Sequence, residues 1–120
     1  MDETEKEVVR RFLRDFKQIA TAGRGVDIVD RRKNMQSLAQ LGLTKRNCIA
    51  LILGLSVEDY CDGPKPDKGR PGEIWEFGQV IEGKEVYVKL KIAQVGRVML
   101  AKCLSFHIAE HPLCFPCREK

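Results

Sequence analysis

The stretch EIWEFGQVIEGKEVYVKLKI, residues 73–92, decides the expected fold of this chain. Apolar and polar side chains alternate on both sides of the dipeptide Glu82-Gly83, which is typical of two antiparallel strands joined by a tight turn. With a two-residue turn at that dipeptide, Trp75 lies opposite Leu90, and the apolar side chains of both strands share one face. The sequence therefore predicts a hairpin with one buried face and one polar face.

The polar face of this hairpin carries ionisable side chains that could take part in catalysis or binding. The same register places Glu76 opposite Lys89 and Gly78 opposite Tyr87. Tyr87, Lys89 and Lys91 alternate along the second strand, so they point to the same side. We therefore expect a carboxylate, a phenol and two ammonium groups on the face that is turned away from the core.

A third strand is expected from RVMLAKCLSFH, residues 97–107, after a tight turn at residues 94–96. Strict alternation predicts Leu104 and Phe106 on the core side, and Cys103, Ser105 and His107 on the polar side. Lys102 breaks this alternation, because it is in phase with Leu104. Either its ammonium group reaches past the sheet margin or it marks a β-bulge, and a bulge would change the face that His107 occupies.

The first half of the chain is helical in pattern. Apolar residues recur at three- and four-residue spacing over residues 8–20, which predicts an amphipathic helix. A second helix is expected after Asp27 or Asp30, with Gly42 as its C-terminal stop, and Thr44 is placed to cap a third. These helices are expected to cover the apolar face of the sheet.

A long loop separates the helices from the strands. Three prolines and three glycines lie between Asp62 and Gly72, so we expect no regular structure there. The whole chain, residues 1–120, is then expected to form a single α+β domain, in which the N-terminal helices pack on a three-stranded antiparallel sheet.

Composition narrows the class of protein. The chain has 43% hydrophobic and 32% charged residues, which is typical of a folded globular domain. Its N-terminus is acidic, its longest apolar run is too short for a bilayer, and its five cysteines are odd in number. These features predict a cytoplasmic protein with reduced thiols and no membrane partner.

The positive charge is concentrated in one segment. Residues 84–105 contain five cationic side chains and one carboxylate, so this segment alone carries a charge of +4, which equals the net charge of the chain. A basic surface on an otherwise neutral protein indicates an anionic partner such as RNA. A solvated sheet face, with Glu76 and Lys89 as a cross-strand ion pair, is the structural alternative.

The polar face combines the groups that metal-free RNA cleavage requires. A proton acceptor frees the 2′-hydroxyl to attack phosphorus, a proton donor protonates the leaving 5′-oxygen, and lysines stabilise the added negative charge. Glu76, Tyr87, Lys89 and His107 are the candidate catalytic residues. No cofactor or metal is expected for this chemistry.

Several segments in order resemble one known family. They are LGLTKRNCIALILGLSVEDY (residues 41–60), GPKPD (63–67), PGEIWEFG (71–78), GKEVYVKLKI (83–92) and CLSFHIAEHPLCFP (103–116). Together they resemble the MqsR (motility quorum-sensing regulator) toxins of type II toxin-antitoxin systems. The resemblance implies a RelE-like α+β fold and a ribosome-independent mRNA interferase, an endoribonuclease that cleaves single-stranded mRNA. It also implies a cognate antitoxin, encoded by an adjacent gene, that neutralises the toxin.

The resemblance assigns roles residue by residue. Tyr87 matches the active-site tyrosine of the family, Glu76 stands where a shorter member has a glutamine, and His107 stands where it has a lysine. A second lysine of the family has no direct counterpart, so Lys65 or Lys68 is expected to supply its charge. The remaining expected RNA contacts are Arg70, Lys91, Arg97 and His111. These departures imply a subgroup in which His107 is the general acid, while the general base is either Glu76 or a lysine.

A zinc site is the competing interpretation of the C-terminal residues. The potential ligands Cys103, His107, His111, Cys114 and Cys117 form one compact cluster, whereas structural zinc usually takes two separated pairs. On a regular strand, Cys103 and His107 share a face but lie roughly 13 Å apart, too far for one ion. A non-catalytic module that binds RNA or a protein partner through the same basic face is the other alternative.

Chelation separates the zinc interpretation from the nuclease interpretation. Because the expected chemistry uses only protein groups, we predict that EDTA leaves the rate of RNA cleavage by the purified protein unchanged. A labelled single-stranded RNA, incubated with and without EDTA and resolved on a denaturing gel, tests this. Loss of cleavage on chelation, restored by added zinc, would support the zinc site instead.

Overall fold

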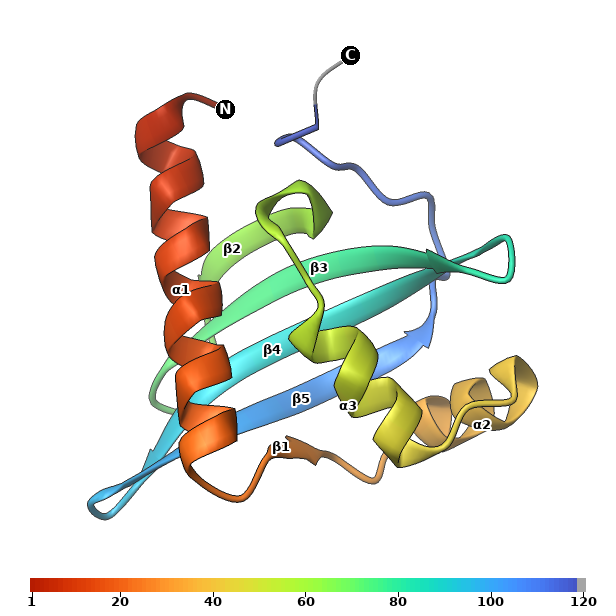
Figure 1. The fold of residues 1–120 in the computed structure, drawn as a ribbon, viewed down its shortest axis with the longest axis horizontal. Helices are drawn as coiled ribbons and strands as arrows, with labels where there is room; N and C mark the ends of the chain where they lie inside the picture. The colour runs from red at the N-terminus through yellow and green to blue at the C-terminus, as the bar shows by residue number, and fades with distance from the viewer. Residues whose placement is uncertain (119–120) are drawn as a thin grey trace.

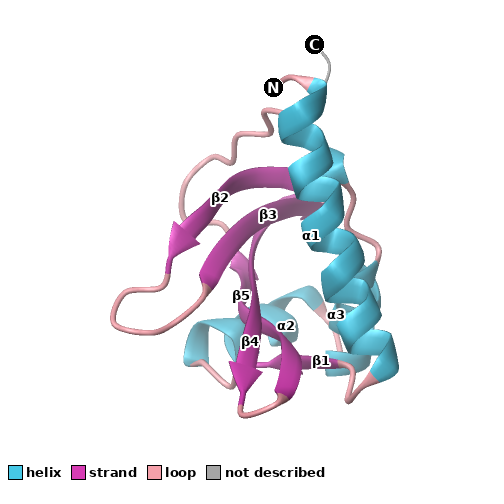
Figure 2. Cartoon of the chain, turned by 90° about the vertical axis from the view of Figure 1, so that its left-hand side faces the viewer, coloured by secondary structure: helices cyan, strands magenta, loops and turns pink. Residues whose placement is uncertain are grey.

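A five-stranded mixed sheet in the order β1-β5-β4-β3-β2 organises the chain in the computed structural model, which describes residues 1–118. The helices are α1 (Glu3–Ala22), α2 (Arg32–Leu41) and α3 (Lys45–Leu53), followed by the single 3-10 turn η1 (Val57–Asp59). The strands are β1 (Val26–Ile28), β2 (Tyr60–Pro66), β3 (Glu73–Ile81), β4 (Lys84–Val95) and β5 (Val98–Ile108). α1 and α3 cover one face of the sheet, while the chain after β5 runs along the other side (Figures 1 and 2).

The hairpin of β3 and β4 has the register expected from the sequence. Trp75 lies opposite Leu90, Glu76 opposite Lys89 and Gly78 opposite Tyr87, so this expectation is confirmed. Both residues of the Glu82-Gly83 turn have positive φ angles, 51° and 74°, which is the turn geometry that matches the twist of antiparallel strands. The α+β class is also confirmed.

A β-bulge in β5 resolves the position of Lys102. Lys89 pairs with Ser105 and Leu90 pairs with Cys103, so Leu104 is an extra residue with no partner on β4. The extra residue shifts the alternation by one position. Lys102 therefore joins the polar face opposite Lys91, and the expectation that Cys103 lies on that face is wrong.

The bulge affects the remainder of β5 in a simple way. Residues after Leu104 keep the expected phase, so His107 lies opposite Tyr87 on the polar face. Cys103 is instead fully buried on the core side, where it belongs to the hydrophobic cluster. The turn before β5 is at Gly96-Arg97, two residues later than the start of the expected turn, because Val95 pairs with Val98.

The sheet is wider than the three strands expected. β1 pairs in parallel with β5 through residues 26–28, a segment too short to leave an alternating pattern. At the other edge β2 pairs with β3, so the first half of the expected loop is a strand. β2 is interrupted by two irregularities between Tyr60 and Lys65, and such irregular edge pairing accommodates its prolines.

The apolar face of the sheet packs against α1. The Phe12 ring is stacked on Trp75 with centroids 4.6 Å apart, and Phe16 and Phe77 beside them are fully buried. The helix ends agree with the sequence: Thr44 caps α3 through a capping box, and Gly42 ends α2 with a φ of 68°. None of the described helices is long and apolar enough to cross a membrane.

Two buried side chains of α2, Asn34 and Ser37, bond to the backbone along the open edge of β5. Asn34 donates from its side-chain amide to the carbonyl oxygens of Val29 and Leu104, at 2.9 and 3.1 Å, and accepts from the Phe106 amide at 3.0 Å. The Ser37 hydroxyl accepts from the Ile108 amide at 3.0 Å. The pairing of β1 with β5 ends at Cys103. Beyond it, these two side chains supply the hydrogen-bond partners that the backbone of β5 would otherwise lack, so they hold the bulged half of β5 in place.

We predict that Asn34→Ala lowers the free energy of unfolding by about 3 kcal/mol, because it leaves buried backbone groups of β5 without partners. Urea denaturation followed by circular dichroism measures this change. Gln40→Ala, at an exposed position of the same helix, is the matched control and should change stability little. Equal stability of the two variants would contradict this role of Asn34.

Candidate active site

The polar face of the sheet is the surface away from α1 and α3. Three cross-strand rows cross it. Asp62, Glu76, Lys89 and Ser105 form one row; Gly78, Tyr87 and His107 form the second; Ile74, Lys91 and Lys102 form the third. The β-pairing therefore brings together the four candidate catalytic residues, Glu76, Tyr87, Lys89 and His107, on adjacent rows.

Glu76 is the centre of a hydrogen-bonded network. Its carboxylate accepts a short hydrogen bond from the Tyr87 hydroxyl and pairs with Lys65 at 2.9 Å. Lys65 also pairs with Asp62 at 2.8 Å. The ion pair between Glu76 and Lys89, which belonged to the structural alternative, does not form among residues 1–118. Lys65 occupies this carboxylate instead, from β2, a strand that the sequence did not reveal.

Electrostatics fix the protonation of this network. The hydrogen bonds that Lys65 donates to the Asp62 and Glu76 carboxylates raise the pKa of Lys65 above its ordinary value, so this ammonium group stays charged. The hydrogen bond from Lys65 in turn lowers the pKa of the Asp62 carboxyl. Lys65 is therefore a fixed positive charge and is unsuited to act as a general base.

Tyr87 is a hydrogen-bond donor at neutral pH. Burial raises its pKa strongly, and the hydrogen bond to the Glu76 carboxylate raises it further, because both disfavour the tyrosinate. Its ring centroid lies 5.3 Å from that of His107, with the planes tilted by 40°. The phenol thus links the carboxylate on β3 with the imidazole on β5.

The backbone orients the His107 imidazole. Its Nδ1 lies 3.0 Å from the carbonyl oxygen of Ile108. A carbonyl oxygen only accepts hydrogen bonds, so Nδ1 carries the proton in this contact. Nε2 is then the ring nitrogen left to exchange a proton with a ligand, which is the arrangement that general acid–base catalysis needs.

The lysines of this face differ in their partners. Lys91 is nearly buried, with 9% of its side chain exposed, and pairs with Asp67 at 2.6 Å. Lys102 lies 3.8 Å from Asp27. Lys89 has no carboxylate within ion-pair distance among residues 1–118, and its ammonium group lies 6.0 Å from the centre of the Tyr87 ring. Lys89 is therefore the lysine on the strands of this face that is free to contact an anion.

The other expected RNA contacts are spread along the molecule. His111 lines a cavity of about 260 Å³ with Tyr87 and His107, so it belongs to the site. Lys68 and Arg70 lie in the exposed loop between β2 and β3. Arg97 is at the tip of the β4–β5 hairpin, roughly 26 Å from Tyr87 along the strand. The structure does not bring Arg97 together with the catalytic candidates.

Gly78 has a role that the sequence did not reveal. A Cβ at this position would overlap Leu113 Cδ1 and lie 3.1 Å from the Phe115 ring, because the C-terminal segment crosses the sheet here. A glycine inside an otherwise alternating strand is the signal that could have indicated such a close approach. The segment forms one wall of the His107 cavity.

The cysteines and histidines of the C-terminal region do not converge. Cys103 is buried on the core side and His107 lies on the opposite face, so the expectation that they share a face is corrected by the bulge. Cys117 packs beside Met1 in the hydrophobic cluster, while Cys114 is exposed. Within residues 1–118, no three His, Cys, Asp or Glu side chains are grouped as metal ligands.

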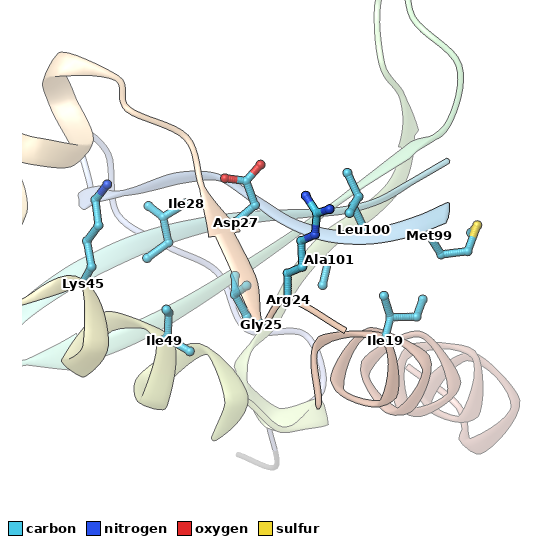
Figure 3. A pocket seen from close by; sticks show the side chains of 11 residues that line it. Ile19, Arg24, Gly25, Asp27, Ile28, Lys45, Ile49, Met99, Leu100 and Ala101 are labelled. Atoms are coloured by element: carbon cyan, nitrogen blue, oxygen red, sulfur yellow. The ribbon is translucent and has the colours of Figure 1, made fainter. Parts of the chain in front are cut away.

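A larger cavity lies at the other edge of the sheet. It measures about 430 Å³ and is bounded by the end of α1, by β1, by α3 and by the start of β5. Figure 3 shows aliphatic side chains such as Ile19 and Ile49 in its wall, with Arg24 and Lys45 set apart from each other. Within residues 1–118, its lining includes no histidine, cysteine or tyrosine, whereas His107, His111 and Tyr87 line the smaller cavity. The smaller cavity is therefore the better candidate for a site of acid–base catalysis.

Comparison with known proteins gives no independent identification. No protein-family model, no curated protein and no solved structure matches the chain. The resemblance to MqsR toxins, and the RelE-like fold that it implies, therefore stay predictions.

We predict that Glu76→Gln lowers the pKa of Tyr87 towards its ordinary value, because it removes the negative charge that disfavours the tyrosinate. Alkaline titration of the protein labelled with ¹³Cζ-tyrosine measures the pKa of each of the two tyrosines. Asp30→Asn, which removes an exposed carboxylate on the loop before α2, is the matched control. A Tyr87 titration identical in Glu76→Gln and in the wild type would show that the two side chains are not coupled.

Proposed function

We propose that the protein is a metal-independent endoribonuclease that cleaves single-stranded mRNA at its polar sheet face. The observation that supports this best is the row of Tyr87 and His107, with the Glu76 carboxylate bonded to the phenol and Nε2 of the imidazole free. In such a row, the carboxylate and the phenol can accept a proton on one side of a phosphate, while the imidazole donates a proton on the other side. Lys89, which has no carboxylate within ion-pair distance among residues 1–118, lies beside them.

In the proposed reaction the 2′-oxygen of one nucleotide attacks the adjacent phosphorus. Its proton passes to the Tyr87 oxygen as the phenol gives its own proton to Glu76. The bond between phosphorus and the 5′-oxygen breaks, and His107, which enters this step as the imidazolium with a proton on both ring nitrogens, donates its Nε2 proton to that oxygen. The products are a 2′,3′-cyclic phosphate and a 5′-hydroxyl. Lys89 stabilises the negative charge that develops on the phosphoryl oxygens.

The charge on Lys65 supports the assignment of Glu76 rather than a lysine as the final proton acceptor. The pKa of Lys65 is raised by its two carboxylate partners, so it holds its proton throughout the reaction. Lys91 is held by Asp67, whose pKa its hydrogen bond lowers. We therefore assign Lys65 and Lys91 a structural role, in which their positive charges balance the carboxylates of the polar face.

The biological role that we propose is that of a type II toxin controlled by a cognate antitoxin in the cytoplasm. The resemblance to MqsR toxins supports this, and so does the exposure of the cavity beside His107, since a free ribonuclease would damage the cell that makes it. Co-purification of the protein with the product of an adjacent gene would support the antitoxin directly.

Binding without cleavage is the alternative function. It is favoured by the ion pairs that hold Lys65 and Lys91, because these two lysines are then not free to stabilise the charge that develops on a phosphate during cleavage. A non-catalytic module would retain labelled RNA in a gel-shift experiment but would never shorten it. The same experiment therefore separates the two functions.

We predict that His107→Ala lowers the rate of RNA cleavage by at least about 100-fold, the usual contribution of a general acid. Cleavage of a labelled single-stranded RNA by purified protein measures the rate, and thermal melting verifies that the variant is folded. Arg97→Ala, at the distant hairpin tip, should lower the rate much less. A His107→Ala variant that is as active as the wild type would remove His107 from the mechanism.

A further inference from the structure

The segment after β5 is fastened across the polar face. The Ala109 amide donates to the carbonyl oxygen of Glu85 at 2.9 Å, and the Leu113 amide donates to the Glu85 carboxylate at 3.2 Å. At its far end, Arg118 donates to the carbonyl oxygen of Glu58 at 3.1 Å. Figure 1 shows this segment passing beside the β3–β4 hairpin towards the start of α1. We name residues 109–118 the C-terminal strap.

The strap is an extended segment with one face towards the protein. Leu113 and Phe115 are half-buried and Cys117 is buried, while the residues between them are exposed. Leu113 and Phe115 lie over Gly78, where a side chain would displace them. Contacts at both ends and in the middle therefore fix the wall that the strap contributes to the His107 cavity.

The lining of this cavity fits an uncharged planar group. Its walls are the Tyr87 and His107 rings and the strap from Ala109 to Leu113, including the Pro112 ring. Among residues 1–118, no lysine or arginine lines it, and its carboxylate is that of Glu110, which pairs with Lys33 at 2.7 Å. A phosphate would meet negative charge there, whereas an aromatic heterocycle would meet rings and aliphatic carbon.

The size of the cavity limits what it can hold. Its volume of about 260 Å³ is just below the range of about 300–1,000 Å³ that small-molecule sites usually have. One heterocycle fits such a space, but a stretch of oligonucleotide does not. Single-stranded RNA is commonly recognised by bases that are turned out and stacked on side chains of this kind.

We infer that the cavity between Tyr87, His107 and the C-terminal strap is a slot for one unpaired nucleobase of the RNA, with Pro112 and Leu113 as its specificity-determining wall. This inference rests on the proposed ribonuclease function. A base in the slot brings its own sugar and phosphate next to the Nε2 of His107, with Lys89 on the neighbouring row. The strap therefore selects the nucleotide beside which the chain is cut.

Two variants change the wall of the slot while leaving Glu76, Tyr87, Lys89 and His107 in place. Leu113→Ala enlarges the slot, and Gly78→Val pushes the strap away from the sheet. Leu53→Ala, which removes the same side chain from a half-buried position on α3, is the matched control. Thermal melting identifies any variant that does not fold.

The first measurement maps cleavage along one defined transcript. We expect the wild type to cut beside one preferred base, and the ratio of preferred to other sites to fall about tenfold in Leu113→Ala, which corresponds to about 1.4 kcal/mol. Gly78→Val should lower the ratio as well, and Leu53→Ala should retain it. An unchanged ratio in both folded slot variants would overturn the inference.

The second measurement tests the slot without cleavage. The four ribonucleoside 3′-monophosphates are titrated into the protein while the NMR signals of the Tyr87 and His107 rings are followed. Shifts in the wild type that weaken in Leu113→Ala support the slot, even where no RNA is cut and the proposed nuclease function fails. No shift with any nucleotide would overturn it, and so would shifts produced only by a tryptophan-containing peptide, which would assign the slot to a protein partner.

Discussion

The bulge at Leu104 sets which side chains of β5 reach the polar face of the sheet. One extra residue in β5 changes the phase of the strand, so that Lys102 before it and His107 after it lie on the same face, while Cys103 and Phe106 both remain in the core. Without the bulge, a strand that buried Cys103 would turn His107 towards α1 and leave Tyr87 without its neighbour. Asn34 holds this half of β5 by bonding to the backbone at Leu104 and Phe106, so a buried amide in a helix supports the candidate site.

The polar face is largely neutralised by its own carboxylates. Lys91 has 9% of its side chain exposed, and burial of an ammonium group at that level requires a partner, which Asp67 supplies. Lys65 is likewise held between Asp62 and Glu76. The face therefore offers an anion few free charges, with Lys89 nearest to the Tyr87 and His107 rings. In the proposed mechanism, selectivity would then come from shape and stacking at the C-terminal strap rather than from a broad positive field.

The sequence predicted the hairpin of β3 and β4 well, because a two-residue turn and strict alternation leave one sensible register. It failed where the backbone departs from repetition. β1 is only three residues long, and β2 contains prolines that normally indicate a loop. The bulge in β5 leaves a single signal in the sequence, which is that Lys102 is out of phase with its neighbours. The four catalytic candidates were identified from their alternation, but the partner of Glu76 was not, because Lys65 reaches it from the unrecognised β2. The strap over Gly78 depends on contacts between distant segments, which alternation does not encode.

In the proposed mechanism, protein groups alone drive attack by the neighbouring 2′-hydroxyl of RNA. Analysis of the new chain ends, after incubation of a defined transcript with the purified protein, tests it most directly. We expect 2′,3′-cyclic phosphates on the upstream fragments and 5′-hydroxyls on the downstream fragments. Ends with a 3′-hydroxyl and a 5′-phosphate, which arise when water attacks the phosphorus, would contradict it.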